Sequence, residues 1–385
     1  MRIGFVCRRF FPPDGTVGGI EVFVLTLAQR LQCLGHNPVV VSGELAGSKC
    51  PDKDSIGGVP VYRFALPKQR PHVLSHRLQY QRVVEQVVRE EKLDLVEYFD
   101  QDGMLLSRRF GCPLVVRLHQ NGSVRHVVQG LPGSMRDPNF FFERRLLMMA
   151  DALVAVSDWV GKMSLRIAGL EHLGYRVIYN GVDTTMFVPT QDAEVDPGLI
   201  LFAGQLIDRK GLPTLFEAIQ TVMLRHPETR LRCVGANPRV PGYPSPAERY
   251  LSSFPSPLRS RVDFVGSITH DRMPDEFRRA GLCVFPSTAE GLGIVVLEAM
   301  ACGATVIYMK DGVGPEVITH SVDGLLCDTR DPTSLASTIL QALSSPDLRR
   351  SLGERARQTV LARFSLDKTV PENVSLYEEM IGGRR

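Results

Sequence analysis

Two glutamates, Glu290 and Glu298, lie eight positions apart in the stretch PSTAEGLGIVVLEAMACGATVI (286–307). An apolar strand is expected before Glu290, and Gly291 and Gly293 permit a tight turn after it. A helix that begins after this turn would be about two turns long at Glu298, so the second carboxylate projects from the side of the helix. An ionised carboxylate accepts hydrogen bonds at both oxygens. The pattern therefore suits one long ligand that carries hydroxyl pairs near both ends.

The start of this helix and a second loop offer sites for an anion. Amide groups at a helix N-terminus favour negative charge. Here these amides belong to Gly293, Ile294 and Val295. The loop GQLIDRKG (204–211) follows another apolar strand and carries Arg209 and Lys210. Cations at this position would stabilise a diphosphate whose negative charge grows as it leaves. A pair of solvated surface charges is the alternative interpretation.

Glycines also follow the first apolar strand of the chain. Gly18 and Gly19 come just before a helix that we expect over residues 21–34. Glycine lets the backbone approach an anion closely, and the helix N-terminus would add its free amides. The spacing is not GxGxxG, which disfavours a dinucleotide site. A flexible turn between a strand and a helix is the alternative.

Short apolar runs rich in β-branched residues alternate with amphipathic segments, which is typical of parallel α/β sheets. The first series of predicted strands covers residues 2–7, 38–42, 93–99, 113–119 and 151–157. The second series covers residues 199–204, 231–235, 262–266, 282–287 and 305–309. Predicted helices in the first series include residues 21–34, 74–91 and 140–149.

The chain has 385 residues, more than the ~250–300 at which a single hydrophobic core stops growing. The segment between the two strand series, residues 180–198, is rich in turn formers. We therefore predict an N-terminal domain over residues 1–188 and a C-terminal domain over residues 189–367. Each is expected to be a Rossmann-like, doubly wound parallel sheet, and ligands bind at the carboxyl ends of such strands. Facing domains would then share one cleft.

Composition excludes several classes of protein. Charged residues make up 23% and hydrophobic residues 44% of the chain, as in ordinary globular proteins. The net charge of +3 is too small to indicate nucleic-acid binding. The eight cysteines form no CxxC pair, which favours a reduced, cytoplasmic protein. No apolar stretch reaches the ~18–20 residues that span a bilayer, and the N-terminus does not look like a secretory signal.

Several motifs, in order along nearly the whole chain, carry a resemblance to a known family. They are GGIE, VSDWV, VIYNGVDTTMF, ILFAGQLIDRKG, the E-x7-E unit and DGVGPEVI. Together they resemble the retaining glycosyltransferases of family 4, which have the GT-B fold. The resemblance implies two Rossmann-like domains and a C-terminal helix, here residues 368–385, that crosses back to the N-terminal domain.

The resemblance also implies roles for individual residues. Glu290 would bind the donor sugar, Glu298 the ribose of the nucleotide, and Lys210 the diphosphate. His119 would lie beside the donor sugar and the reacting carbon. Gly18 and Gly19 would close over the diphosphate, together with the amides of Gly293, Ile294 and Val295. The family usually has Arg where this chain has Gln205, and Arg209 would compensate from another direction.

The implied reaction is a retaining transfer of a hexosyl group from a nucleotide diphosphate sugar to an acceptor hydroxyl. No carboxylate nucleophile is implied, so we expect front-face departure, with the leaving phosphate oxygen taking the acceptor proton. Neither a metal nor another cofactor is required. Asp100, Asp102 and Arg117 are expected on the acceptor side.

The acceptor is expected to be a sugar, a small molecule or a lipid-linked compound. Residues 1–190 contain 23 Lys and Arg against 18 Asp and Glu, a net charge of +5. The segment 55–84 contains no acidic residue and carries Arg63, Arg77 and Arg82. Basic and apolar side chains together suit an anionic membrane surface or a phosphorylated acceptor. A solvated basic face is the alternative.

Two other functions remain open at this stage. One is a nucleotide-sugar epimerase of the same architecture, against which the E-x7-E unit and the GGIE segment argue. The other is a non-catalytic protein that binds a sugar nucleotide, for which Gln205 is the sequence support.

Overall fold

The computed structural model describes residues 1–11, 18–45, 52–66, 73–100, 105, 107, 111–130, 138–190, 195–236 and 242–383. The chain forms two compact units. The first contains Met1–Asn180 and Thr369–Arg385, and the second contains Gly181–Lys368. Residues 181–188, which the sequence analysis groups with the N-terminal domain, thus belong to the second unit.

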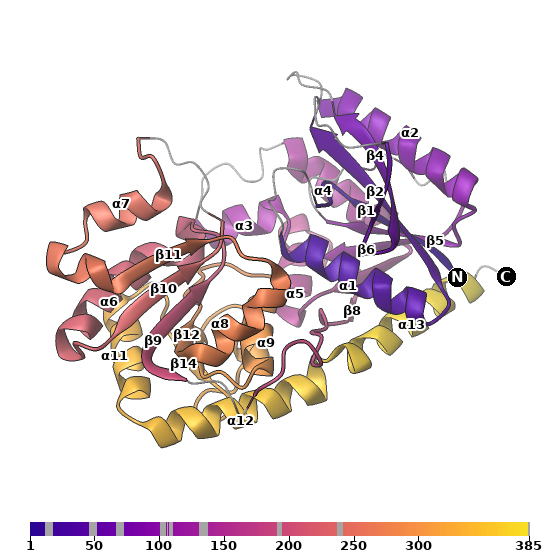
Figure 1. Cartoon of the computed structure of the whole chain (residues 1–385). Coiled ribbons are helices and arrows are strands. Elements are labelled where there is room, and N and C mark those ends of the chain that lie inside the picture. Colours follow the sequence, from indigo (N-terminus) through magenta and orange to yellow (C-terminus); the bar gives the residue numbers. More distant parts are fainter. Residues whose placement is uncertain are drawn as a thin grey trace. The chain divides into compact units, whose positions relative to one another are not determined.

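The described residues of the first unit form an eight-stranded sheet with the order β3-β4-β2-β1-β5-β6-β7-β8 (Figure 1). All neighbouring strands are parallel except β3 and β4. The strands are β1 (Arg2–Cys7), β2 (Asn37–Leu45), β3 (Lys53–Ile56), β4 (Val59–Leu66), β5 (Leu95–Phe99), β6 (Leu114–Leu118), β7 (Ala152–Ala155) and β8 (Arg176–Val177). The chain order reverses between β1 and β5, so the loops after these strands diverge there.

Helices connect the strands of this sheet and cover both of its faces (Figure 1). They are α1 (Gly19–Cys33), α2 (Val73–Glu91), α3 (Gly122–Val128), α4 (Pro138–Met149), α5 (Asp158–Ala168) and most of α13 (Leu366–Gly382). The terminal helix α13 packs beside the sheet although it is far from it in sequence.

The alternation of side chains along a strand decides which helix each residue meets. On β5, Tyr98 points to the face covered by α2, where its ring lies 6.3 Å from that of Tyr80. Its neighbour Glu97 points to the opposite face, where it accepts a hydrogen bond from Tyr377 of α13. Helix α1 lies on this second face too, because the ring of its Phe23 lies 6.4 Å from that of Phe99.

The second unit has a parallel, six-stranded sheet with the order β11-β10-β9-β12-β13-β14 in the described residues. Its strands are β9 (Asp196–Ala203), β10 (Arg230–Val234), β11 (Val262–Gly266), β12 (Ala280–Val284), β13 (Val306–Met309) and β14 (Leu325–Cys327). The order reverses between β9 and β12. The loops that follow these two strands therefore lead to opposite faces of the sheet, and ligands bind at such a switch point.

Helices cover this second sheet as well (Figure 1). They are α6 (Leu212–Arg225), α7 (Pro246–Ser252), α8 (Met273–Arg279), α9 (Ile294–Ala301), α10 (Gly314–Val317), α11 (Pro332–Leu343) and α12 (Pro346–Arg363). One buried apolar cluster joins α6 and α11 to the central strands, with Leu215, Ile219 and Ile339 completely enclosed. Burial of apolar side chains on this scale fixes the strand ends from which the loops emerge.

Each predicted strand coincides with an observed one, so the prediction of two parallel-sheet α/β domains is confirmed. The prediction missed the hairpin of β3 and β4. Its turn consists of Gly57 and Gly58, with φ angles of 56° and 83°. Two successive positive φ angles define a type I′ turn, which glycine pairs favour between antiparallel strands. The basic segment that we considered for a membrane surface thus includes part of a sheet.

Candidate active site

Two loops interlock at the switch point of the second sheet. The loop after β9 contains Gly211, whose φ is 77°. A Cβ atom on this residue would lie 1.8 Å from the carbonyl oxygen of Pro286, in the loop after β12. The Thr288 amide also donates to the carbonyl of Arg209 at 3.0 Å. Glycine is required at position 211 both for the backbone conformation and for this close approach.

The interlocked loops bring together Lys210 and Glu290, as the sequence predicted for residues of one site. Their side chains form an ion pair and are 16% and 12% exposed. The Ser287 hydroxyl donates to the same carboxylate at 2.8 Å. Burial acts to raise the pKa of Glu290, but the charges of Lys210 and Arg209 outweigh it, so the pKa lies below its usual value. The carboxylate is therefore ionised and held in a fixed orientation.

Arg209 and Gln205 lie in the same loop. The Arg209 guanidinium donates to the carbonyl of Ala289 at 3.2 Å, so its charge points toward the segment that carries Glu290. Gln205 directly follows Gly204 and is half-buried. Two cationic side chains, Arg209 and Lys210, thus converge on this loop pair.

Helix α9 begins beside the same pair of loops. Its N-cap, Gly293, has φ 81°, and a Cβ atom there would lie 2.6 Å from the Tyr308 hydroxyl. The amides of Ile294 and Val295 lie in the first turn, where no preceding helical carbonyl is in reach. These amides are suited to an anion, because the helix dipole adds to their partial charge.

Glu298 lies in the middle of α9 and is 6% exposed. Its Oε1 is 2.7 Å from Nε2 of His270, whose ring packs 5.2 Å from that of Phe187. Burial acts to lower the pKa of His270, but hydrogen bonding to Glu298 and the charge of Glu298 outweigh it and raise the pKa. The contact therefore orients the second glutamate and favours the cationic form of His270.

The first unit contains a separate group of candidate side chains. Gly18 and Gly19 open α1, and the Gly18 amide donates to the Glu21 carboxylate at 3.1 Å. Burial raises the pKa of Glu21. A small hollow lies at the carboxyl ends of β1 and β5, and it is lined by Val6, Cys7, Arg8, Arg9, Ile20, Glu21, Tyr98 and Phe99. The predicted glycine loop thus borders a hollow at the switch point of this sheet.

His119 follows β6, and its ring lies 5.4 Å from both Phe23 and Phe99. Burial, and then the charge of Arg117, hold its pKa well below the usual value. Its amide donates to Asp100 at 2.9 Å. Asp100 is 1% exposed, and burial raises its pKa to about 7. His119 and Asp100 thus share one corner of the sheet as uncharged groups at slightly acid pH.

The backbone is strained next to His119 and Asp100. Gln120, the residue after His119, has a φ angle of 80°, which is uncommon for a residue other than glycine. Its Nε2 atom, Nε2 of His119 and Oδ2 of Asp100 are buried and have no hydrogen-bond partner within the described residues. Strain and unsatisfied polar atoms concentrate at functional sites in proteins.

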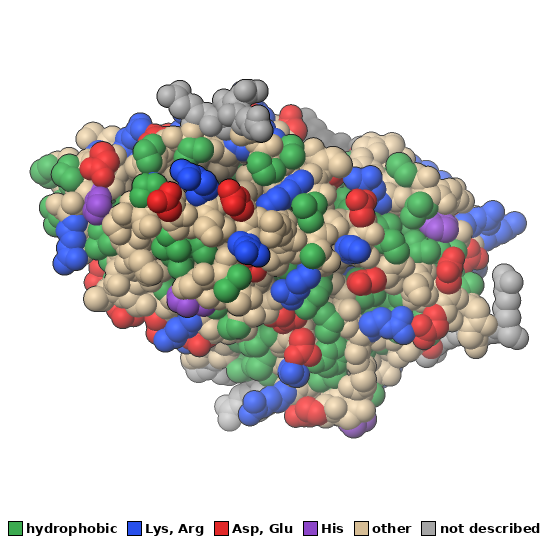
Figure 2. All heavy atoms as spheres, turned by 90° about the horizontal axis from the view of Figure 1, so that it is seen from below, with side chains coloured by type: hydrophobic (Ala, Val, Ile, Leu, Met, Phe, Trp, Pro, Cys, Tyr) green, Lys and Arg blue, Asp and Glu red, His purple; other side chains and the backbone are tan. Residues whose placement is uncertain are grey.

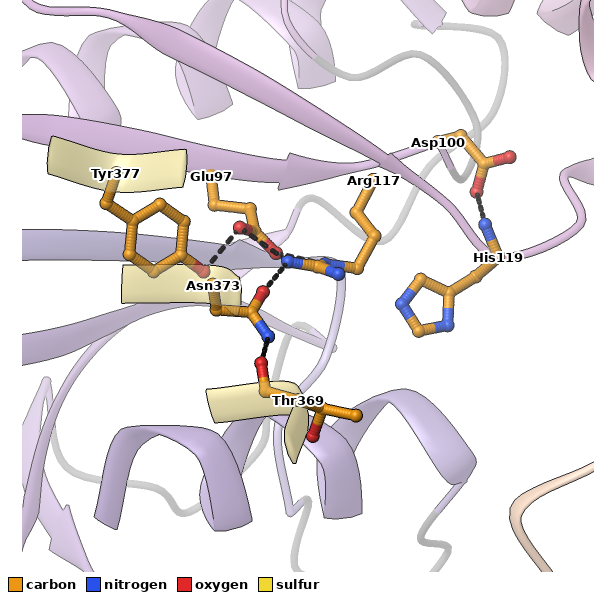
Figure 3. Close-up of polar contacts among 7 residues, drawn as sticks. All are labelled: Glu97, Asp100, Arg117, His119, Thr369, Asn373 and Tyr377. Atoms are coloured by element: carbon orange, nitrogen blue, oxygen red, sulfur yellow. Dashed lines mark hydrogen bonds and ion pairs between the residues drawn. The ribbon is translucent and has the colours of Figure 1, made fainter. Parts of the chain in front are cut away.

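Arg117 does not lie where we expected it. Its side chain is completely buried and is bound by Glu97, at 2.5 Å and 3.1 Å, and by Asn373 (Figure 3). This burial contradicts the prediction that Arg117 lines the acceptor side. Asp102, the other residue predicted there, lies outside the described residues.

Sequence reasoning missed three groups that the structure places at or behind these sites. They are His270 beside Glu298, Ser287 beside Glu290, and the pair Asn373 and Tyr377 beside Arg117. Ser287 and His270 both follow apolar strands, and this position is a sequence signal that indicates site residues. Asn373 and Tyr377 are four residues apart on a helix, and only their burial distinguishes them from surface residues.

Two further properties concern metals and membranes. Within the described ranges, no three His, Cys, Asp or Glu side chains gather into a possible metal site. None of the helices in these ranges combines the length and apolarity that a bilayer crossing needs.

Sequence comparison defines the class of protein. Residues 187–359 match the family described as "Glycosyl transferases group 1", and residues 17–186 match "Glycosyltransferase Family 4". A relative over the full length is D-inositol 3-phosphate glycosyltransferase 2 of Catenulispora acidiphila, 26% identical over 96% of this chain and 92% of that protein. The chain belongs to glycosyltransferase family 4.

Solved structures agree on the fold. Sucrose-phosphate synthase from Thermosynechococcus elongatus superposes with a TM-score of 0.83 at 22% identity, over 99% of both chains. Anabaena HepE in complex with UDP-glucose superposes with a TM-score of 0.73 at 20% identity, over 97% of this chain and 99% of that one. The fold of this chain is the GT-B fold.

Proposed function

We propose that this glycosyltransferase moves a hexosyl group from a nucleotide diphosphate sugar to an acceptor hydroxyl, with retention of configuration. The observation that carries the proposal is the convergence of Lys210 and Arg209 with the N-terminus of α9. Two cations and two amides at a helix N-terminus suit a leaving diphosphate better than any other common group. The UDP-glucose complex of Anabaena HepE supports a donor of this type.

Each glutamate of the pair has a distinct part in this proposal. Glu290, held by Lys210 and Ser287, would accept hydrogen bonds from the donor sugar. Glu298, oriented by His270, would accept them from the ribose. A donor that extends from one glutamate to the other passes the amides of Ile294 and Val295, which lie between them in sequence.

The chemical step would proceed by front-face departure. Lys210, Arg209 and the α9 amides would stabilise the negative charge on the diphosphate as its bond to the anomeric carbon breaks. The leaving phosphate oxygen would accept the proton of the incoming hydroxyl. His119 would bind and orient the sugar as a neutral imidazole, consistent with its lowered pKa. These protein groups supply the positive charge, so we propose that no metal is needed.

The first test is a thermal-shift panel of UDP-, GDP- and ADP-hexoses, with and without EDTA, on the wild type and on Glu298→Ala. One nucleotide class should raise the Tm of the wild type, independently of EDTA, and fail to raise that of the variant. With that donor, the anomeric configuration of the product is then read by NMR. An inverted product, or transfer that stops in EDTA, would contradict the proposal. An epimerised donor formed without any acceptor would indicate the epimerase, and binding without turnover would indicate a non-catalytic protein.

The proposed acceptor is a sugar, a small molecule or a lipid-linked compound, which the enzyme would approach at a membrane surface in the cytoplasm. Within the basic segment, Arg63 and Arg77 are buried, whereas Leu78 and Arg82 of α2 are exposed. On the face drawn in Figure 2, Lys and Arg side chains are interspersed with Asp and Glu. The exposed part of α2 is therefore the place to test. Arg82→Glu should weaken co-sedimentation with anionic vesicles, and equal binding by wild type and variant would contradict a contact there.

A further inference from the structure

A buried polar cluster joins the last helix of the chain to the sheet of the first unit. It consists of Glu97 on β5, Arg117 on β6, and Asn373 and Tyr377 on α13 (Figure 3). Arg117 donates to both carboxylate oxygens of Glu97, and Tyr377 donates to one of them at 2.6 Å. Each member is at most 2% exposed. The cluster thus contains a full ion pair that has been removed from water.

Asn373 is oriented for this contact. Its Nδ2 donates to the carbonyl of Thr369 at 2.7 Å, one turn earlier in α13. Its Oδ1 is therefore turned toward Arg117 and accepts from Nη2 at 2.5 Å. Nη2 is shared between Glu97 and Asn373, so the plane of the guanidinium is fixed by groups on both β5 and α13. Apolar side chains would dock the helix equally well, because a buried ion pair is weak support for stability.

The fixed guanidinium lies next to the ring that holds His119. Arg117 and His119 are two residues apart, so they project from the same side of the strand and its continuation. The guanidinium carbon is 5.0 Å from the centre of the Phe23 ring. That ring in turn lies 5.4 Å from the His119 ring. Figure 3 shows His119 beside the cluster on the adjoining part of the same strand segment.

We propose that Asn373 and Tyr377 are positioning residues for the transfer reaction. By fixing the Arg117 guanidinium against Phe23, they fix the His119 ring that orients the donor sugar. The inference rests on the proposed function for the role of His119, but the contacts that carry it are independent of any substrate. It gives the C-terminal helix a part in the chemistry of the site in addition to its part in the fold.

The first test measures the position of the His119 ring directly. The ring-proton signals of histidine-labelled full-length protein are recorded by NMR, and His119→Gln identifies the signal of His119 among those of the nine histidines. Tyr377→Phe removes only the hydroxyl that Glu97 accepts. Asn373→Leu keeps the size of the side chain and removes the Arg117 contact. Both should shift the His119 signals, because ring currents from Phe23 and Phe99 depend steeply on geometry.

The matched control is Tyr175→Phe. This tyrosine also lies in the first unit and also donates to a carboxylate, that of Asp158, at 2.7 Å. Its loss should lower stability to a comparable degree and leave the His119 signals in place. If Tyr377→Phe and Asn373→Leu lower the Tm but do not move these signals, the cluster only fastens the helix and the inference is wrong.

A kinetic measurement completes the test. Tyr377→Phe should lower kcat by ~10-fold, less than the ~100-fold that a displacement of 1 Å can cause. The KM for the donor should change much less than kcat, because Lys210, Glu290 and Glu298, which are proposed to bind most of the donor, lie in the second unit. An unchanged kcat would overturn the inference. If the wild type transfers no sugar at all, the proposed function fails, and the NMR comparison still decides whether α13 positions His119.

Discussion

The two units hold their charged groups in opposite ways. In the first unit, the Arg117–Glu97 pair is completely buried between strands and a helix. In the second unit, the Lys210–Glu290 pair lies on interlocked loops and keeps some exposure on both side chains. The histidines follow the same division, since the pKa of His119 is lowered and that of His270 is raised. The fold encloses both charges of the Arg117–Glu97 pair. The charges of the Lys210–Glu290 pair remain partly accessible to a ligand.

The cause of this difference lies in where the residues sit on the sheets. Glu97 and Arg117 are inside β5 and β6, where neighbouring elements enclose every side chain. Lys210 and Glu290 follow the ends of β9 and β12, in the segments that connect these strands to the next helices. Substitutions in the first unit should therefore change stability before they change binding. Substitutions in the second unit should change binding before they change stability.

The largest effect on stability is expected for Glu97→Ala. It leaves the Arg117 guanidinium buried without its counter-charge, which should lower the free energy of unfolding by about 3–5 kcal/mol. Urea unfolding is followed by the fluorescence of Trp159, the sole tryptophan of the chain, which lies in α5 of the first unit.

The control for this variant is Glu379→Ala, which removes the partner of Arg176. That pair is 45% and 59% exposed, so its loss should cost at most about 1 kcal/mol. Equal losses of unfolding free energy in the two variants would show that the buried pair contributes no more to stability than a surface pair.

The next effect concerns catalysis in the second unit. Lys210→Ala should lower kcat/KM by about 100- to 1,000-fold, the usual loss when one donor to developing negative charge is removed. The unfolding curve read from Trp159 should hardly change. Lys310→Ala is the control, because Lys310 also pairs with a carboxylate, that of Asp328, but is half exposed. A similar loss of activity in both variants would remove the special role of Lys210.

The sequence predicts the second site better than the first. Arg209, Lys210, Glu290 and Glu298 occur in two short motifs, and each motif is a strand, a glycine turn and a helix start that folds locally. The glycines at 211 and 293 are needed at the observed positive φ angles, so local pattern and structure agree there. The prediction of a shared donor site for these residues stays a prediction until ligand binding is measured.

The first site escapes such reasoning because long-range packing determines it. Arg117 is separated from Asn373 by 256 residues, and no local pattern indicates that the two meet. The sequence analysis places Arg117 on the acceptor side, whereas contacts with α13 enclose it. His270 follows a strand, which is a local signal, but its pairing with a glutamate 28 residues further on is not indicated by any local pattern.

A pH dependence should distinguish the carboxyl groups of the two units. Asp100 has a usual pKa of 3.8, which burial raises to about 7. Between these values the native state keeps a proton that the unfolded state loses, so stability falls as the pH rises through this window. The slope reaches at most about 1.4 kcal/mol per pH unit. Asp100→Asn should remove this slope in urea unfolding curves measured by Trp159 fluorescence.

Asp94→Asn is the control for this experiment. Asp94 is exposed next to β5 and accepts a hydrogen bond from the Arg2 amide at 2.7 Å. This variant should keep the slope of the wild type. Parallel curves for the wild type and Asp100→Asn would mean that Asp100 is ionised in the folded protein, like the cation-paired Glu290.

The smallest effect is expected for His270→Gln. The pKa of His270 is raised above 6.5 in the folded state, so the ion pair with Glu298 stabilises the protein fully below pH 6.5. This contribution is lost as the pH rises through the raised pKa. His270 is 39% exposed, so solvent screening limits the contribution to less than about 1 kcal/mol.

Glutamine at position 270 still donates to Glu298 but does not titrate. The Tm of the variant should therefore lie below that of the wild type at pH 5.5 and approach it by pH 8.5. A constant difference across this range would mean that His270 orients Glu298 by hydrogen bonding alone, and the contrast with the neutral His119 would lose its electrostatic basis.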